Sequence, residues 1–267
     1  MLTESFKYLS FTLVRYSIAV ALFFAIGAAA AFFIAPSRKI AGSAIFILTI
    51  LVSTYGVLLI YPGFAFFGLV RTGAATSEKI VAFTFDDGPS RKYTPEILDV
   101  LKENGAHATF FMLGESAARN SGLVERIVRE GHLAANHTYG HHFLLTKSAG
   151  DRKSEISRTH ELIKSITGAQ MKYFRAPYEY KDLRLLLLLR RMDYEYVGHG
   201  INSGDVTAGD ADKVVSRILN GLRPGGIILM HDSRGNRQAT VDALRRVLPE
   251  MRKRGYRAVT VEELPGE

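Results

Sequence analysis

The sequence contains no cysteine and no tryptophan among its 267 residues. Without cysteine there are no disulfide bonds, no thiolate nucleophile and no cysteine-ligated metal, so a bound metal must rely on histidine, aspartate or glutamate. The G-x-S-x-G motif, which presents a serine nucleophile on a strand-to-helix turn, is also absent. The formal net charge of +8 forms no basic stripe. We therefore expect no nucleic-acid partner.

Charged residues are nearly missing from the N-terminal part of the chain. Residues 16–34 and 40–70 carry none, and the sequence PSRK separates the two runs. A helix needs about 20 apolar residues to cross the roughly 30 Å core of a bilayer. We therefore predict two transmembrane helices, near residues 12–34 and 41–61, within a membrane segment that covers residues 1–71. The lipid bilayer is thus an expected partner, and the protein is expected to be a multi-pass membrane protein.

Two other interpretations of this segment remain open. The sequence AAAA at residues 28–31 would suit a signal peptidase, although the apolar run continues beyond it. A buried helical hairpin of a soluble domain would also be apolar, but such a pair rarely needs more than forty nearly uncharged residues. The flanking charges do not decide the orientation, because Arg38 and Lys39 in the connection are matched by basic residues on the other side.

From about residue 78, short apolar runs alternate with amphipathic segments. The runs predicted as strands are residues 80–85, 108–113, 133–136, 172–176, 194–198, 226–231 and 256–261. The segments predicted as helices are residues 94–103, 123–130, 151–166, 182–192, 210–222 and 240–254. Such alternation is typical of a parallel sheet. The fold class is therefore predicted as α/β, a distorted (β/α) barrel of about seven strands over residues 72–267, preceded by the two transmembrane helices.

Polar clusters follow the ends of the predicted strands. Asp86 and Asp87 directly follow a strand, and a Gly-Pro turn then leads the chain away. The carboxyl ends of parallel strands meet at one edge of the sheet, where α/β enzymes carry out their chemistry. His137 and His141 are four residues apart, so one tight turn can aim both imidazole rings at the same point. A carboxylate from a neighbouring strand would complete a metal site with open positions for water.

Four segments, in this order, resemble the motifs of the NodB-homology polysaccharide deacetylases, carbohydrate esterase family 4. They are TFDDGP at 84–89, NHTYGHH at 136–142, FRAPY at 174–178 and LMHD at 229–232. The resemblance extends over about residues 79–263. It implies a distorted (β/α) barrel and a metal-dependent enzyme that removes acetyl groups from chitin-like, peptidoglycan or xylan sugars. The bond cleaved would be a carbon–nitrogen amide bond other than a peptide bond.

The resemblance also implies a role for each motif residue. Asp87, His137 and His141 would bind a divalent metal, expected to be Zn²⁺, with Co²⁺ or another first-row metal as the alternative. Asp86 would be the general base, and Arg175 would orient it and keep it ionised. This assignment agrees with elementary chemistry, since an opposed cation and a metal both favour an ionised carboxylate.

The remaining implied roles concern the leaving group and the substrate. His231 would be the general acid, and Asp205 would hold and charge its ring. The backbone N–H of Tyr178 would join the metal in stabilising the oxyanion, and Leu229 would line the acetyl pocket. A histidine held protonated by a carboxylate suits this task, because the amine leaving group needs a proton.

The chain departs from the family pattern on the substrate side. Residues 202–206 read NSGDV, whereas the family usually has Asp-Ser-x-Asp-Trp. The second aspartate is kept as Asp205, but the other changes leave the pocket wall and the partner of the general acid open. Glu179 stands where the family often has glycine. His142 and His199 are additional histidines, and we predict no ligand role for either.

The sequence therefore predicts a membrane-anchored, metal-dependent hydrolase that removes N-acetyl or similar acyl groups from amino sugars of a glycan. Peptidoglycan or a chitin-like oligosaccharide is the expected substrate, and the catalytic domain is expected outside the cytoplasm. One alternative is a deacylase of a lipid-linked sugar, because two adjacent spans would hold the site near headgroup height. Another is an inactive, metal-containing glycan-binding module, which the altered residues 202–206 would explain.

Overall fold

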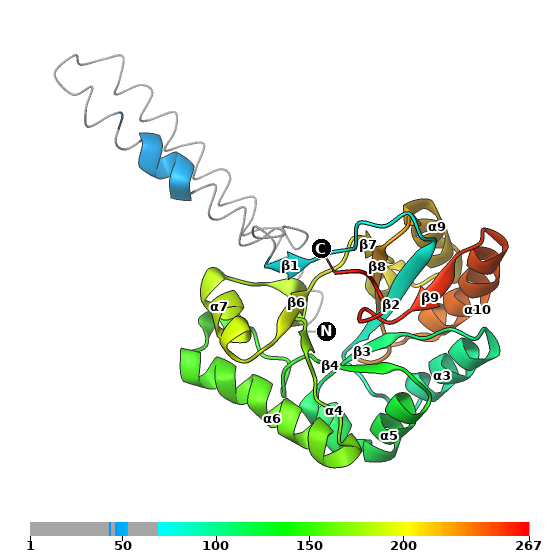
Figure 1. Cartoon of the computed structure of the whole chain (residues 1–267), viewed down its shortest axis with the longest axis horizontal. Coiled ribbons are helices and arrows are strands. Elements are labelled where there is room, and N and C mark those ends of the chain that lie inside the picture. Colours follow the sequence, from blue (N-terminus) through cyan, green and yellow to red (C-terminus); the bar gives the residue numbers. More distant parts are fainter. Residues whose placement is uncertain (1–42, 44–45, 53–68, 267) are drawn as a thin grey trace. The chain divides into compact units, whose positions relative to one another are not determined.

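The computed structural model describes residues 43, 46–52 and 69–266 of the chain (Figure 1). The contacts divide the chain into two units, residues 1–61 and residues 62–267. The second unit carries all four segments on which the family resemblance rests.

The predicted membrane segment falls almost entirely outside the described part of the chain. Within the first unit, residues 46–52 are helical, and most of their large apolar side chains are exposed. Among the residues that the structure describes, no helix combines the length and the hydropathy that a membrane crossing requires. Apart from these few residues, the predicted spans near 12–34 and 41–61 lie outside the described residues, and they stay a prediction.

The second unit is built on one parallel sheet. Its strands in the described part of the chain are β1 Val70–Arg71, β2 Ile80–Asp86, β3 Thr109–Met112, β4 Leu133–Asn136, β5 Tyr173–Phe174, β6 Glu195–Val197, β7 Ile201–Asn202, β8 Gly226–His231 and β9 Arg257–Val259. The strand order is β1-β6-β5-β4-β3-β2-β8-β7, with β9 beside β2. Because β1 and β7 end this order, the sheet is a curled half-barrel that stays open between them. The predicted α/β barrel is thus confirmed in its coarse form.

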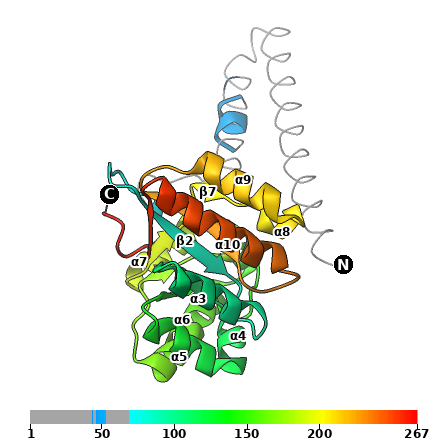
Figure 2. The same cartoon turned by 90° about the vertical axis from the view of Figure 1, so that its right-hand side faces the viewer.

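Helices connect most of the successive strands and cover the outside of the sheet (Figure 1). They are α3 Tyr93–Glu103, α4 Gly114–Arg119, α5 Ser121–Arg129, α6 Ala149–Thr167, α7 Leu183–Arg191, α8 Asp205–Ala208, α9 Ala211–Gly221 and α10 Gln238–Lys253. Two short 3₁₀ helices, η2 Leu144–Thr146 and η3 Pro177–Glu179, lie in loops. Figure 2 shows α10 packed between α9 and α3. Helices α4 and α8 are not predicted from the sequence, because they are too short to display a helical period.

β2 is the central strand, and all seven of its residues are buried. One edge pairs with β8 along almost its whole length, and the other edge pairs with β9 and then with β3. The continuous apolar runs of β2 and β8 follow from this position, because both faces of a covered parallel strand are buried. The register aligns Asp86 with His231 in the neighbouring strand. The general base and the general acid that the sequence predicts therefore lie side by side.

The inside of the half-barrel is an apolar core to which nearly every strand contributes. Its buried members are Ile80, Ala82, Phe111, Ala135, Tyr173, Val197, Ile227, Val259, Val261 and Leu264. Side chains alternate between the two faces of a strand. Asp86 therefore points to the same side as Ile80 and Ala82, and His231 and Leu229 point to the same side as Ile227. The predicted site is the polar end of this interior core.

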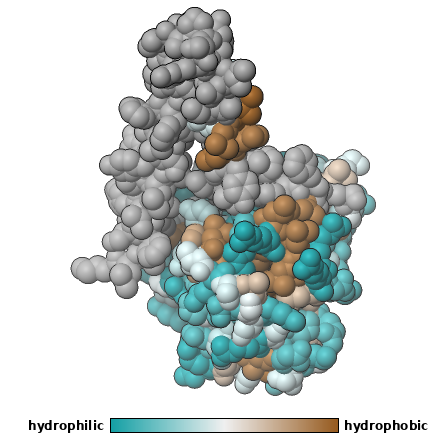
Figure 3. Space-filling view, turned by 90° about the vertical axis from the view of Figure 1, so that its left-hand side faces the viewer, coloured by the Kyte–Doolittle hydropathy of each residue, from teal (hydrophilic) through white to brown (hydrophobic). Residues whose placement is uncertain are grey.

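On the face shown in Figure 3, the coloured residues are mostly hydrophilic, with apolar patches between them. Helix α7 shows how one leucine-rich segment serves both surface and core. Leu185 and Leu189 are buried against the sheet, whereas Leu183 and Leu187 are 45% and 43% exposed. The spacing of the exposed pair, four residues, places them together on the outer face of the helix.

Gly88 tests the packing beneath the turn that follows β2. A Cβ atom at this position would lie 2.1 and 2.2 Å from the carboxylate oxygens of Asp232, which is fully buried. We expect Gly88→Ala to lower the free energy of unfolding by about 1–3 kcal/mol, because the buried carboxyl must shift. Denaturant unfolding measures this change. Gly122→Ala is the control, since a Cβ there meets nothing within 4 Å in helix α5. Equal stability of the two variants would contradict the prediction.

Candidate active site

Two neighbouring carboxylates leave the end of β2 in different directions. Asp86 is the last residue of the strand, and Asp87 follows with φ 77°, a left-handed conformation that is rare for a residue with a side chain. Asp86 Oδ1 accepts a hydrogen bond from Arg175 Nη1 at 2.8 Å. Asp87 Oδ1 lies 3.0 Å from His141 Nε2 and 3.5 Å from His137 Nε2. The strained turn thus separates the partners of the two adjacent aspartates.

Asp87, His137 and His141 form a buried cluster whose ligand atoms lie within 4.8 Å of one another. Burial acts to raise the pKa of Asp87, but the adjacent His137 and His141 rings hold that pKa well below its usual range. Burial lowers the pKa of His141. An ionised carboxylate and neutral imidazoles are the forms that bind a metal. Asp87 Oδ1 is buried and lacks a hydrogen-bond partner. These residues therefore fit a divalent metal with nitrogen and oxygen ligands.

The loop that carries the two histidines is fixed by its own polar contacts. The Nδ1 atom of His137 lies 2.8 Å from the carbonyl oxygen of Arg175. A carbonyl only accepts, so Nδ1 carries the proton and the lone pair of Nε2 faces Asp87. Thr138 Oγ1 accepts a hydrogen bond from the backbone N–H of His141 at 3.2 Å. The four-residue spacing of the sequence therefore becomes one tight loop that aims both rings at the same carboxylate.

Arg175 is fully buried beside the general-base candidate. Besides Asp86, it donates to Thr84 Oγ1 at 2.7 Å and to the backbone carbonyls of Val197 and Gly198 at 3.0 and 2.7 Å. These partners lie on β2 and at the end of β6, so the guanidinium cannot turn away without losing several buried hydrogen bonds. Arg175 thereby fixes one oxygen of Asp86.

His231 and the buried Asp205 form a second pair at the site. The Nδ1 atom of His231 lies 2.9 Å from Asp205 Oδ1, and the His231 backbone N–H donates to Asp205 Oδ2 at 2.8 Å. Thr240 Oγ1 also donates to Oδ2, at 2.9 Å. Burial acts to lower the pKa of His231, but the charge of Asp205 and its hydrogen bond raise that pKa to about 9. Asp205, the aspartate kept in the segment NSGDV, is thus the partner of His231, which the sequence alone left open.

Tyr178 and Leu229 lie where a substrate would meet these groups. The Tyr178 ring packs edge-on against the His141 ring, with centroids 4.7 Å apart, and the side chain is 46% exposed. Its backbone has φ 59° at the start of the loop after β5. Leu229 is buried on β8, two residues before His231, and faces the same side of the strand. The roles assigned to these two residues stay predictions.

Several polar contacts near the site were not found from the sequence. Glu179 is buried with φ 57°, and its Oε1 lies 2.6 Å from His199 Nδ1 and 3.9 Å from Arg175 Nε. Arg234 Nε lies 4.0 Å from Asp87 Oδ2, and the arginine side chain is 42% exposed. The only sequence signal for Glu179 is its position, where the family that the chain resembles often has glycine. No sequence signal pointed to Arg234, because a loop arginine is ordinarily a solvated surface residue.

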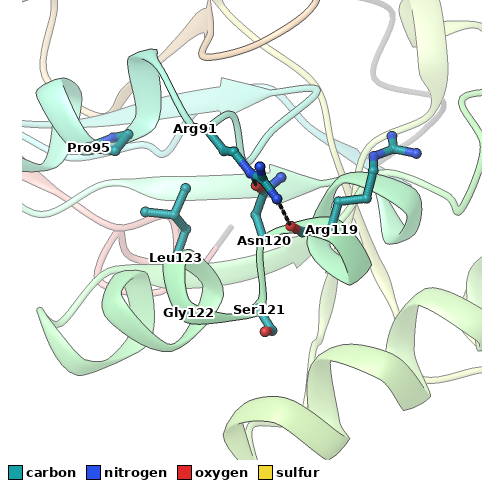
Figure 4. Close-up of a pocket in the computed structure, with 7 residues that line it drawn as sticks. All are labelled: Arg91, Pro95, Arg119, Asn120, Ser121, Gly122 and Leu123. Carbon is teal, nitrogen blue, oxygen red and sulfur yellow. Dashed lines mark hydrogen bonds between the residues drawn. The ribbon is translucent and has the colours of Figure 1, made fainter.

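A shallow, open depression of about 420 Å³ lies beside the turn that follows β2 (Figure 4). It is lined by Arg91, Pro95, Arg119, Asn120, Ser121, Gly122 and Leu123. Within it, Arg91 donates to Asn120 Oδ1 at 3.1 Å, and Asn120 in turn donates to the carbonyl oxygen of Pro89 at 3.1 Å. None of the residues predicted for catalysis or metal binding lines this depression.

Comparison with known proteins gives a consistent result. The sequence pattern of the family described as "Polysaccharide deacetylase" matches residues 73–197. Two proteins of Bacillus cereus, both named peptidoglycan-N-acetylglucosamine deacetylase, are similar to the chain. One is 35% identical over 69% of this chain and 67% of its own length, and the other is 34% identical over 74% and 93%. A crystal structure of a peptidoglycan N-acetylglucosamine deacetylase superposes with a TM-score of 0.73, at 32% identity, over 75% of this chain and 95% of that one.

The pair of His231 and Asp205 predicts a specific pH dependence. Since the folded-state pKa of His231 is raised to about 9, its proton stabilises the fold below pH 6.5, and that contribution is lost as the pH rises through 9. Asp205→Asn removes the largest of the charges that raise the pKa of His231, so burial should lower that pKa. We expect the alkaline limb of kcat/KM to move down by two pH units or more, about a hundredfold loss at pH 8.5.

The pH–rate profile and an NMR titration of the His231 imidazole measure this shift. Asp193→Asn, at an exposed aspartate, is the matched control and should leave the alkaline limb in place. An unchanged limb in Asp205→Asn would show that another group supplies the proton.

Proposed function

Since this chain belongs to the polysaccharide deacetylase family, whose members hydrolyse the carbon–nitrogen bond of N-acetyl groups on sugars, we propose that its substrate is the N-acetylglucosamine of peptidoglycan. The chain is a hydrolase of this amide bond, and the family is metal-dependent. The observation that carries the proposal is the register of β2 and β8, which sets Asp86 and His231 side by side next to the buried Asp87 cluster. The names of the two Bacillus cereus relatives support the choice of sugar.

Asp87, His137 and His141 would hold the metal. Zn²⁺ suits two imidazoles and one carboxylate best, and Co²⁺ or another first-row metal is the alternative. When bound, the metal polarises the acetyl carbonyl and lowers the pKa of a water molecule. His137 is kept in the required tautomer by its Nδ1 contact, so its Nε2 lone pair is presented without reorganisation.

Asp86 acts as the general base in this mechanism. Arg175 occupies its Oδ1, whereas Oδ2 lies on the side of the metal-binding cluster, 4.0 Å from His137 Nε2. Oδ2 is therefore the atom that accepts the proton of the attacking water. The buried guanidinium keeps the carboxylate from rotating, which preserves the geometry of the transfer.

His231 acts as the general acid. Its Nδ1 faces Asp205, so Nε2–H is the proton available to the departing amine. With a pKa of about 9, the ring is protonated at neutral pH. The backbone N–H of Tyr178 donates to the developing oxyanion, and Leu229 contacts the acetyl methyl group. Asp86 takes a proton from the attacking water, and His231 gives a proton to the departing nitrogen. The products are a free amine and acetic acid, which ionises to acetate.

The two alternative functions rest on narrower grounds. The inactive glycan-binding module was suggested by residues 202–206, but the contacts of Asp205 with His231 support retained acid chemistry.

The other alternative, a deacylase of a lipid-linked sugar, depends on the predicted membrane segment at residues 1–71. We propose that this segment anchors the protein with its catalytic domain outside the cytoplasm. A reporter fused to the C-terminus tests the orientation, and a cytoplasmic signal would favour a lipid-linked intermediate over wall polymer.

Metal removal tests the proposed chemistry on the full-length protein. We expect a strong chelator to abolish acetate release from peptidoglycan and added Zn²⁺ to restore it, because Asp87, His137 and His141 supply ligands and no nucleophile. Asp86→Asn should keep its metal but lose at least about a hundredfold in kcat, and its unfolding temperature should fall because the buried Arg175 charge loses its carboxylate partner. Metal content, unfolding temperature and acetate release are measured on each sample. Full activity after complete metal removal, or an active Asp86→Asn protein, would exclude the mechanism.

Arg234 offers a test of the substrate class. Peptidoglycan carries free carboxylates on its peptides, whereas chitin oligosaccharides are neutral. An exposed guanidinium 4.0 Å from Asp87 can attract such a carboxylate. We expect Arg234→Ala to reduce kcat/KM about tenfold on peptidoglycan fragments and less than about twofold on chitin oligosaccharides. Arg129→Ala, at an exposed arginine of helix α5, is the control. Equal losses on both substrates would contradict this assignment.

A further inference from the structure

We propose that Glu155 is the positioning residue of the metal-binding loop, an inference that rests on the metal site proposed above. Glu155 lies on helix α6 and touches none of the three ligands. Its carboxylate is directed instead at the backbone between His137 and His141. It acts through the loop, and its effect should appear in metal affinity.

One buried carboxylate holds three positions of this loop. Glu155 Oε2 accepts hydrogen bonds from the backbone N–H groups of Tyr139 at 3.0 Å and Gly140 at 2.9 Å. Its Oε1 lies 3.0 Å from His142 Nδ1. Hydrogen bonds to a charged acceptor are stronger than neutral ones, and the residue is only 9% exposed. Helix α6 thereby anchors a segment 13 to 16 residues away in the sequence.

The loop needs an anchor because its backbone is strained. Thr138 has φ 72° and His141 has φ 59°, both in the left-handed region that disfavours residues with side chains. Such conformations persist only where the surroundings over-determine them. From the other side, the backbone N–H groups of Gly114 and Glu115 donate to the carbonyls of Thr138 and Tyr139, each at 3.0 Å. Helix α4 therefore holds the loop carbonyls, while Glu155 holds the loop amides.

The packing around Gly140 supports the same role. A Cβ atom there would lie 2.7 Å from Cε1 and 3.0 Å from Nδ1 of the His142 ring. The glycine thus lets the His142 ring, whose Nδ1 lies 3.0 Å from Glu155 Oε1, close over the loop backbone. His142 is consequently an outer support of the loop, in line with the prediction that it is not a ligand.

The experiment measures metal affinity of the full-length apoprotein with Zn²⁺ alone, by competition with a chromophoric chelator. Glu155→Ala removes the acceptor of both amides, and we expect Zn²⁺ affinity to fall by about 10- to 100-fold, as when an outer-shell partner of a metal ligand is removed. Glu155→Gln keeps a carbonyl oxygen for the same amides and should stay within about threefold of the wild type. His142→Ala removes only the third contact and should also stay within about threefold.

Glu161→Ala, at an exposed glutamate of the same helix, is the matched control. The apoprotein unfolding temperature is recorded for every variant. If Glu155→Ala does not fold, Glu155→Met fills the same volume without an acceptor. Failure of both to fold would show that Glu155 holds the fold itself and would overturn the proposal.

Two binding results would also overturn it. One is wild-type Zn²⁺ affinity in Glu155→Ala, and the other is an equal loss in Glu155→Gln, which would assign the effect to charge instead of hydrogen-bond acceptance. A wild-type protein that binds no Zn²⁺ would refute the proposed function, whereas unchanged affinity in the variants alone refutes only this inference.

Discussion

The buried guanidinium of Arg175 is the contact on which the site depends. The guanidinium joins β2, through Thr84 and Asp86, to the end of β6. The backbone carbonyl of Arg175 accepts a hydrogen bond from Nδ1–H of His137. One residue therefore orients both the base and a metal ligand. Removing one partner of a buried ion pair costs about 3–5 kcal/mol, because the other charge stays buried without compensation. In this site the base and the metal ligand cannot be positioned independently.

Strained backbone conformations also occur at the residues of the site. Asp87, Thr138, His141 and Tyr178 all have positive φ, and all lie within the motifs that form the site. Each such conformation costs about 1–3 kcal/mol and survives only where hydrogen bonds fix the surrounding chain. The strained segments begin at strand ends, which the sheet holds rigidly. Buried carboxylates and the Arg175 guanidinium form hydrogen bonds that fix these segments. The half-barrel thus stabilises the strained conformations that direct neighbouring side chains toward the site.

The sequence predicts the parts of this structure that have a local pattern. The apolar runs of β2 and β8 mark buried strands, and the spacing of His137 and His141 marks a common target. The two-residue strands β1 and β7 show no period, so only the tertiary pairing reveals them. Glu155 was missed for a similar reason, since a glutamate on an amphipathic helix is ordinarily a solvated residue. Long-range hydrogen bonds leave no signal in a single sequence.

The replacement of a common glycine by Glu179 shows how such a departure is accommodated. A buried carboxylate near Arg175 would compete with Asp86 for the guanidinium if it were unpaired. Instead it lies 2.6 Å from His199 and 3.9 Å from Arg175, so the histidine is its main partner. Burial acts to raise the pKa of Glu179, but the hydrogen bond and charge of His199 lower it. The two unexpected residues therefore compensate one another, and the contact between Arg175 and Asp86 is kept at 2.8 Å.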